Sequence, residues 1–340
     1  MSALKVGLIG LGGQGRAHAK HLVKCGENDP YRLVAVCDIR PEMFQWMELK
    51  FNITENSGPM GFSDYHQYTD MDEMLKKEKL DLVVIALPTY LHCEATVKFL
   101  RAGVHVLCEK PMAPTIAECD LMLKTAKETG KKLMIGQCLR FWTEYRILKG
   151  YIDSGEFGRV VAANFWRGSD LPTWGYNNWF QHKELGGGAI YDQHVHDVDM
   201  VQYLFGMPEA VSTSGKIVVK GSNYDTLCTN YIYKDGPVVF SHNDWTLSCK
   251  FSYGFRVNFE RATVESGGGK LLLSRKETGE TEEVSFKAEN ALAAETRYFV
   301  ECVLGEHENM VNSPEASAAT IRLVAAEEAS ADKGAALVRL

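Results

Sequence analysis

Short apolar runs alternate with helical segments through the first 140 residues or so of the chain. We predict buried strands at the apolar runs 4–9, 33–37, 81–87, 104–108 and 133–136. We predict helices at 14–25, 41–51 and 89–102, and a long loop over the polar segment 52–68. Apolar strands without polar alternation, separated by helices, are typical of a parallel sheet covered on both faces. This part of the chain is therefore predicted to be a doubly wound α/β domain.

The pattern changes after about residue 140, where polar and apolar residues alternate within extended segments. We predict strands at 160–167, 210–219, 226–234, 238–247, 255–265 and 270–275, and helices at 291–304 and 314–333. Alternation indicates a sheet with one covered and one open face. We therefore expect two domains, residues 1–135 and residues 136–340, the second an α+β domain with an open, mostly antiparallel sheet. A length of 340 residues agrees with two domains of roughly 150 residues each.

Composition and charge narrow the classes of function. The net charge is −7, which gives no general attraction to phosphates, so no nucleic-acid or membrane partner is expected. The sequence contains no run of 18 apolar residues, so no membrane span is expected. The nine cysteines show no CxxC spacing, which indicates reduced thiols, a cytoplasmic protein and no metal site.

A glycine-rich motif, Gly10-Leu-Gly12-Gly-Gln-Gly15, follows the first predicted strand and opens the first predicted helix. Glycines at this spacing allow a tight turn, close approach of the backbone to a pyrophosphate and packing of helix on strand. Backbone N–H groups and the helix dipole then hold the anion. The motif predicts dinucleotide binding, although a strand–helix turn without ligand remains the alternative.

Asp38 stands 23 residues beyond Gly15, just after the second predicted strand. A carboxylate there accepts hydrogen bonds from both ribose hydroxyls of the adenosine half and repels a 2′-phosphate. We therefore expect NAD as the cofactor and NADP as the less favoured one. Arg40 is a second candidate for cofactor binding, since a guanidinium in this place pairs with a 2′-phosphate.

Two other segments carry candidate acid–base groups. Lys110, in Cys108-Glu-Lys-Pro111, is expected at the carboxyl end of a strand, where ligands bind in doubly wound folds. In the second half, Asp192, His196 and Asp199 follow three glycines and fall at i, i+4 and i+7 of a predicted helix. Flanking carboxylates orient an imidazole and raise its basicity. Taken alone, the Lys110 segment is more often a surface turn, and His and Asp on one helix face are more often a structural pair.

Together, these motifs resemble those of the Gfo/Idh/MocA oxidoreductases over nearly the whole chain. The matching segments are the glycine motif, Ala86-Leu-Pro-Thr-Tyr-Leu-His92, Glu109-Lys-Pro111 and the stretch 186–199. The resemblance implies a Rossmann domain followed by an open α/β domain. It also implies an NAD(P)-dependent dehydrogenase acting on the CH–OH groups of sugars, sugar derivatives or cyclitols, and a homodimer or homotetramer formed through the C-terminal sheet.

The resemblance assigns a role to each matched position. The residues implied to bind the cofactor are Gly10, Gly12, Gln14, Gly15, Asp38, Pro88, Thr89, His92 and Glu109. Lys110, Asp192 and His196 match the catalytic positions. The chemistry agrees, because alcohol oxidation needs a base such as His196 and a cation such as Lys110 to stabilise the developing alkoxide. Asp192 would orient either group or bind a neighbouring hydroxyl.

Candidate substrate-binding residues come from three places. Trp174 and Tyr176 belong to an aromatic segment, and aromatic faces pack on the C–H faces of sugars, although core packing is the alternative. Arg140 and Trp142 precede the second domain, and Arg140 equally fits an ion pair. His194 stands where the family usually has glycine or alanine, so it narrows the substrate site or adds a hydrogen-bond partner. Residues i and i+2 of a helix point about 200° apart, so His194 and His196 are not expected to share a metal ion.

Two other functions remain open at this point. One is an NAD-dependent glycoside-cleaving enzyme that oxidises a hydroxyl transiently, eliminates the leaving group and retains its cofactor. The other is a non-catalytic dinucleotide-binding regulator, against which the presence of Lys110, Asp192 and His196 argues.

Overall fold

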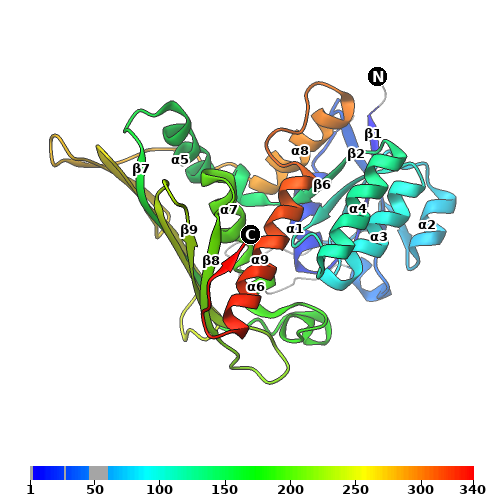
Figure 1. Ribbon diagram of the computed structural model, residues 1–340. Coiled ribbons are helices and arrows are strands. Elements are labelled where there is room, and N and C mark those ends of the chain that lie inside the picture. The colour runs from blue at the N-terminus through cyan, green and yellow to red at the C-terminus, as the bar shows by residue number, and fades with distance from the viewer. Residues whose placement is uncertain (1–2, 27, 46–59) are drawn as a thin grey trace. The chain divides into compact units, whose positions relative to one another are not determined.

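The computed structural model describes residues 3–26, 28–45 and 60–340 (Figure 1). Internal contacts divide the chain into two compact units. The first unit comprises Met1–Cys138 and Asn290–Ala318, and the second comprises Leu139–Glu289 and Ala319–Leu340. The chain thus returns to the first unit at a segment that the sequence-based division assigned to the second domain.

The first unit contains a six-stranded, fully parallel sheet. Its strands are β1 (Leu4–Ile9), β2 (Tyr31–Cys37), β3 (His66–Tyr68), β4 (Leu82–Ile85), β5 (His105–Glu109) and β6 (Leu133–Gly136). Their order is β3-β2-β1-β4-β5-β6, so the direction of strand addition reverses between β1 and β4. This is the doubly wound order that places a ligand at the carboxyl ends of the strands, and it confirms the predicted fold class.

Helices cover both faces of this sheet (Figure 1). They are α1 (Gly13–Leu22), α2 (Met71–Lys77), α3 (His92–Arg101), α4 (Ile116–Thr129) and α8 (Ala291–Leu304), with short 3₁₀ segments η1 (Pro41–Phe44) and η2 (Thr89–Leu91). Helix α1 packs with α8, and α3 packs with α4. Phe299 and Val300 of α8 are buried with Val36, Leu107 and Met134 of the sheet, which is why 290–318 joins this unit.

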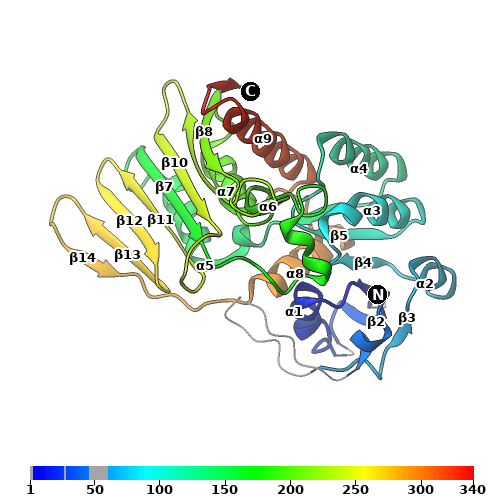
Figure 2. The same ribbon diagram turned by 90° about the horizontal axis from the view of Figure 1, so that it is seen from below.

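The second unit is built on a mixed nine-stranded sheet (Figure 2). Its strands are β7 (Val160–Gly168), β8 (Ala210–Lys216), β9 (Thr226–Ile232), β10 (Val238–Asp244), β11 (Ser252–Phe259), β12 (Ala262–Gly267), β13 (Lys270–Arg275), β14 (Thr281–Glu283) and β15 (Val338–Arg339). Only β7 and β10 pair in parallel; the other described pairs are antiparallel, as predicted.

Helices of the second unit lie on one face of this sheet (Figure 2). They are α5 (Thr143–Ser154), α6 (Gly188–Asp192), α7 (Val195–Phe205) and α9 (Pro314–Asp332), with 3₁₀ segments η3 (Cys138–Phe141) and η4 (Tyr176–Gln181). Helix α7 packs on β7 and β10, and α6 packs on β9 and β10. The first residues of α9 belong to the first unit and the rest to the second. No described helix is long and apolar enough to cross a membrane.

The structure corrects three local predictions. The expected strand 255–265 is two strands, because the N–H groups of Glu260 and Arg261 bond to Arg159 and Phe157 and turn the chain between β11 and β12. The expected loop 52–68 ends in the strand β3. The expected helix 41–51 begins as the 3₁₀ segment η1, and its remainder, with most of the expected loop, lies outside the described residues.

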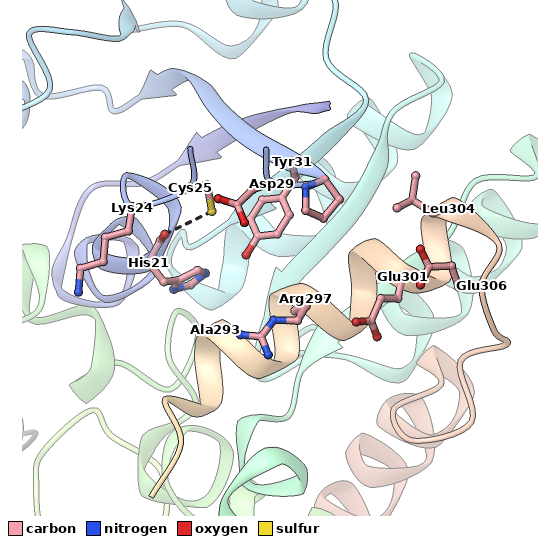
Figure 3. Close-up of a pocket in the computed structure, with 11 residues that line it drawn as sticks. His21, Lys24, Cys25, Asp29, Tyr31, Ala293, Arg297, Glu301, Leu304 and Glu306 are labelled. Carbon is pink, nitrogen blue, oxygen red and sulfur yellow. Dashed lines mark hydrogen bonds between the residues drawn. The ribbon is translucent and has the colours of Figure 1, made fainter. Parts of the chain in front are cut away.

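A pocket of about 370 Å³ opens in the first unit between the end of α1, the start of β2 and α8 (Figure 3). His21 lies at its wall, 9% exposed, with Nε2 3.1 Å from the Thr296 hydroxyl. Burial, together with smaller contributions from the charges of His18, Arg297 and Lys24, lowers the pKa of His21 to about 3. His21 is therefore neutral in the folded protein.

We predict that acid weakens the fold through His21. Its folded pKa of about 3 lies below its ordinary value of 6.5, so the stabilisation is complete above pH 6.5 and is lost as the pH falls toward 3. At about 1.4 kcal/mol per pH unit, unfolding free energy should drop by about 2 kcal/mol between pH 7 and 5 from this group. Urea unfolding of wild type and His21→Gln at pH 7 and pH 5 measures this drop in the free energy of unfolding. An equal drop in both proteins would contradict its assignment to His21.

Candidate active site

Two glycines of the glycine-rich motif are required by close packing in the first unit. Gly10 has φ +85°, and a Cβ there would lie 2.4 Å from the carbonyl oxygen of Ala86. A Cβ on Gly15 would lie 1.8 Å from the carbonyl oxygen of Gly10. Any side chain at these positions would push β1, β4 and α1 apart.

Gly12 has a different surrounding. It is the N-cap of α1, and no described heavy atom lies within 4 Å of the Cβ that it lacks. The first turn of α1 has no acidic residue, and no side chain caps it. The positive N-terminal end of α1 is therefore open to an anion at the place that a Cβ of residue 12 would occupy. This cradle fits a pyrophosphate held by backbone N–H groups.

Asp38 and Arg40 form a pair beside this loop. Asp38 Oδ2 accepts from the N–H of Leu11 at 2.8 Å, which ties the end of β2 to the motif. Arg40 donates from its backbone N–H and Nε to Oδ1 at 3.0 Å each, and from Nη2 to Oδ2 at 3.2 Å. A carboxylate offers about four acceptor sites. Asp38 therefore takes a ribose hydroxyl only when the side chain of Arg40 moves aside.

Glu109 is the centre of a buried cluster at the carboxyl end of β5. Its Oε1 lies 2.7 Å from Nε2 of His18 and 2.7 Å from Nε2 of Gln14, and its Oε2 accepts from the N–H of Lys110 at 3.1 Å. Burial alone would raise the pKa of Glu109, but the contacts with His18 and Gln14 and the charge of Lys110 outweigh it and lower the pKa. Glu109 is an anion that α1 holds in place.

His18 is a site residue that sequence reasoning missed. It is 1% exposed and lies one helical turn after Gln14, so both side chains reach the same carboxylate. The i, i+4 spacing of Gln14 and His18 was the available signal, but the partner stands 91 residues further along the chain.

His92 and Thr89 follow β4. The two ring nitrogens of His92 lie 2.8 Å from the carbonyl oxygens of Leu87 and Pro111, so the ring joins the loops after β4 and β5. Burial lowers the pKa of His92 although both carbonyls favour the protonated ring. Thr89 is 1% exposed, and its hydroxyl has no hydrogen-bond partner among the described residues. An orphaned hydroxyl after β4, beside Pro88, fits the cofactor-lining role that the motif implies.

The helix predicted through Asp192 and His196 is broken. Helix α6 ends at Asp192, the N–H of His194 bonds back to Ala189 at 2.8 Å, and α7 begins at Val195. The i, i+4 geometry assumed for Asp192 and His196 is therefore wrong, since a five-residue step interrupts the helix. The two residues still share one property: within 191–201 they alone are partly exposed, and all others are buried.

Two predicted substrate residues of the second unit are engaged in buried pairs. Arg140, 3% exposed, donates from Nε and Nη2 to Asp199 at 2.8 and 2.7 Å. His194 is fully buried, with Nε2 2.9 Å from Glu327. The arrangement favours the ion-pair alternative for Arg140 and a structural role for His194. A third buried pair, Arg167 with Asp197, was not predicted.

The aromatic segment is partly exposed. Trp174 and Tyr176 are 37% and 48% exposed, whereas Trp179 and Phe180 stack with ring centroids 4.0 Å apart. Gly186 packs against the backbone of Trp179 and Phe180, so η4 lies against the triglycine segment that leads into α6. Trp142 instead packs edge-on against Tyr253 at 5.0 Å, which favours core packing for that residue.

None of the described residues forms a group of three or more His, Cys, Asp or Glu side chains suited to a metal ion. All nine cysteines lie in the described ranges, and none of them forms a disulfide there.

Comparison with known proteins agrees with the description of both the N-terminal and the C-terminal part of the chain. The family profile described as an oxidoreductase family with NAD-binding Rossmann fold matches residues 4–137. The profile of the GFO/IDH/MocA C-terminal domain matches residues 145–265.

Individual relatives cover less of the chain. A 2,7-anhydro-N-acetylneuraminate hydratase of Mediterraneibacter gnavus is 36% identical over 49% of this chain and 46% of its own length. A D-glucoside 3-dehydrogenase of Escherichia coli is 33% identical over 63% of this chain and 57% of its own length. The chain thus spans about half the length of these curated relatives.

A solved structure covers nearly the whole chain. The WlbA dehydrogenase of Bordetella pertussis, in complex with NADH and UDP-GlcNAcA, has a TM-score of 0.81, 22% identity and 99% coverage of both chains. At this identity the likeness shows the fold.

Proposed function

Because the chain belongs to the Gfo/Idh/MocA oxidoreductase family, we propose that it is an NAD-dependent dehydrogenase. Its substrate would be a hydroxyl-bearing carbon of a sugar, sugar derivative or cyclitol. The observation that carries the proposal is the carboxyl edge of the parallel sheet. An open helix N-terminus at Gly12 follows β1, the anion Glu109 and the cation Lys110 stand at the end of β5, and Gln14 of α1 bonds to Glu109 at 2.7 Å.

The residues present fit the cofactor. Gly10, Gly12, Gln14 and Gly15 would hold the pyrophosphate, and Asp38 the adenosine ribose. Glu109 would bind the nicotinamide ribose, with Pro88 and Thr89 beside the dinucleotide and His92 bracing the loops that carry them. When bound, the nicotinamide supplies a hydride acceptor or donor. Acidic Asp38 favours NAD, whereas the paired Arg40 offers a cation to a 2′-phosphate.

The chain itself handles the proton. Histidine is the side chain that most often serves as a general base near neutral pH, so His196 would remove the hydroxyl proton of the substrate. Lys110 would stabilise the alkoxide charge that develops on the same oxygen. Asp192, the other partly exposed residue of 191–201, would orient the base or bind a neighbouring hydroxyl.

Trp174 and Tyr176 support a carbohydrate as substrate, because they are 37% and 48% exposed and aromatic rings pack on the C–H faces of sugars. The relative that acts as a D-glucoside 3-dehydrogenase supports the same substrate class.

The proposal predicts NADH formation that can be followed by absorbance. Purified protein would be given NAD or NADP with a panel of cyclitols, hexoses, sugar acids and glycosides. We expect NADH formation with one class of these compounds, and slower formation of NADPH because Asp38 repels the 2′-phosphate. A higher rate with NADP would contradict the preference assigned to Asp38 and would indicate that Arg40 pairs with the 2′-phosphate.

A second candidate function has one observation in its favour. A relative at 36% identity is named a hydratase. Hydration is a reaction without net oxidation. In such a reaction the substrate would pass a hydride to a retained cofactor, lose its leaving group by elimination and take the hydride back, so product would form without net NADH. Product analysis by mass spectrometry in the same panel separates the two, since conversion without NADH would support the second.

We propose that the open face of the second unit's sheet forms the contact of a homodimer or homotetramer. Ile232, Val238 and Phe240 on neighbouring strands are 41%, 68% and 40% exposed on this unit. Light scattering of wild type against Phe240→Asp tests it; an unchanged mass would contradict this face.

A further inference from the structure

The side chain of Gln137 is buried without a partner. Gln137 directly follows β6 and is 1% exposed, and neither its Oε1 nor its Nε2 has a hydrogen-bond partner among the described residues. Leaving both ends of an amide unpaired in the interior destabilises the folded state. A buried amide without partners calls for an explanation, and a ligand that supplies the missing donor and acceptor is one that its place in the sheet allows.

The position of Gln137 is fixed by strand pairing. Gly136 lies opposite Glu109 in the β5–β6 ladder, and the Cβ that Gly136 lacks would stand 3.2 Å from the carboxyl carbon of Glu109. Gln137 is one residue beyond, so it extends the carboxyl edge that carries Glu109 and Lys110.

The strand order tells which part of a dinucleotide reaches this edge. The order β3-β2-β1-β4-β5-β6 consists of two mononucleotide-binding halves. The half with β1 to β3 carries the glycine-rich motif and Asp38, which suit the pyrophosphate and the adenosine ribose. Gln137 directly follows the last strand of the other half, which receives the nicotinamide nucleotide.

Complementary chemistry then selects the ligand group. A primary amide with a free N–H and a free carbonyl oxygen matches another primary amide, which accepts at its oxygen and donates from its nitrogen. We propose that the side-chain amide of Gln137 binds the carboxamide of the nicotinamide ring and thereby sets the orientation of that ring. This inference rests on the proposed function, because it requires a nicotinamide cofactor.

The test uses three ligands and an isosteric variant, Gln137→Met. Dissociation constants would be measured calorimetrically for NAD, for 3-acetylpyridine adenine dinucleotide, whose acetyl group lacks the N–H donor, and for ADP-ribose, which lacks the ring. We expect the affinity for NAD to fall about tenfold, the affinity for the acetylpyridine analogue to fall less, and that for ADP-ribose to stay within about twofold. The ligand-free variant should melt no lower than wild type, because an unpaired buried amide has been removed.

Other results overturn the inference. Equal losses for all three ligands, or a lowered melting temperature, would make Gln137 a structural residue, and Gln137→Leu repeats the test if the methionine variant does not fold. Unchanged affinity for NAD with a raised KM for the substrate would assign the amide to a substrate hydroxyl. If wild type binds neither NAD nor ADP-ribose, the proposed function itself fails, whereas binding of both without an effect of Gln137→Met rejects this inference alone.

Discussion

Replacing His196 with alanine is expected to lower turnover by about 100- to 10,000-fold, the usual contribution of a general base. The proton of the substrate hydroxyl would then have no acceptor of suitable pKa, while the groups proposed to hold the cofactor, Gly12, Asp38 and Glu109, remain unchanged. Turnover would be measured by NADH absorbance with the substrate found in the screen, and the affinity for NADH by fluorescence titration.

The matched control for His196 is His66→Ala. His66 is an exposed histidine whose Nδ1 lies 2.6 Å from Glu78, and it belongs to no proposed site. We expect its loss to leave turnover and NADH affinity unchanged. Normal turnover in His196→Ala would remove His196 from the mechanism. A parallel loss of NADH affinity would show that the substitution disturbs the cofactor and not the proton transfer.

Truncating Arg140 to alanine is expected to lower the free energy of unfolding by about 3–5 kcal/mol. The substitution leaves Asp199 as a buried charge, 1% exposed, with only the Thr320 hydroxyl at 3.0 Å of its described hydrogen-bond donors. The substitution also removes the guanidinium that lies over the Tyr203 ring, 4.6 Å from the ring centroid. Urea unfolding of the ligand-free protein measures the change.

Two comparisons separate this explanation from a role in substrate binding. Arg146→Ala removes an exposed arginine, 3.5 Å from Glu289, and should cost less than about 1 kcal/mol. The double variant Arg140→Met with Asp199→Leu should recover most of the loss, because a buried pair replaced by apolar side chains is often neutral. If Arg140→Ala keeps wild-type stability and raises KM, Arg140 is a substrate residue.

The sequence was sufficient where the physical cause is local. Apolar runs located β1, β2, β4, β5 and β6, because a strand buried on both faces shows its burial in its own residues. Helix α8 has the bounds that the periodicity predicted, 291–304. The glycine-rich motif indicated its strand–helix turn, because Gly10 and Gly15 are required by contacts within that turn and with the adjoining strand.

Tertiary structure decided what depends on partners distant in the chain. Periodicity cannot show that His18 meets Glu109 across 91 residues, or that Arg140 and His194 face Asp199 and Glu327 in the interior. The break between α6 and α7 is equally invisible, since the apolar spacing continues through it while the backbone of His194 bonds five residues back. The sequence by itself determined the family, the two sheets and the candidate groups; burial and pairing, which arise only when distant segments pack, decided which of those groups remain available for chemistry.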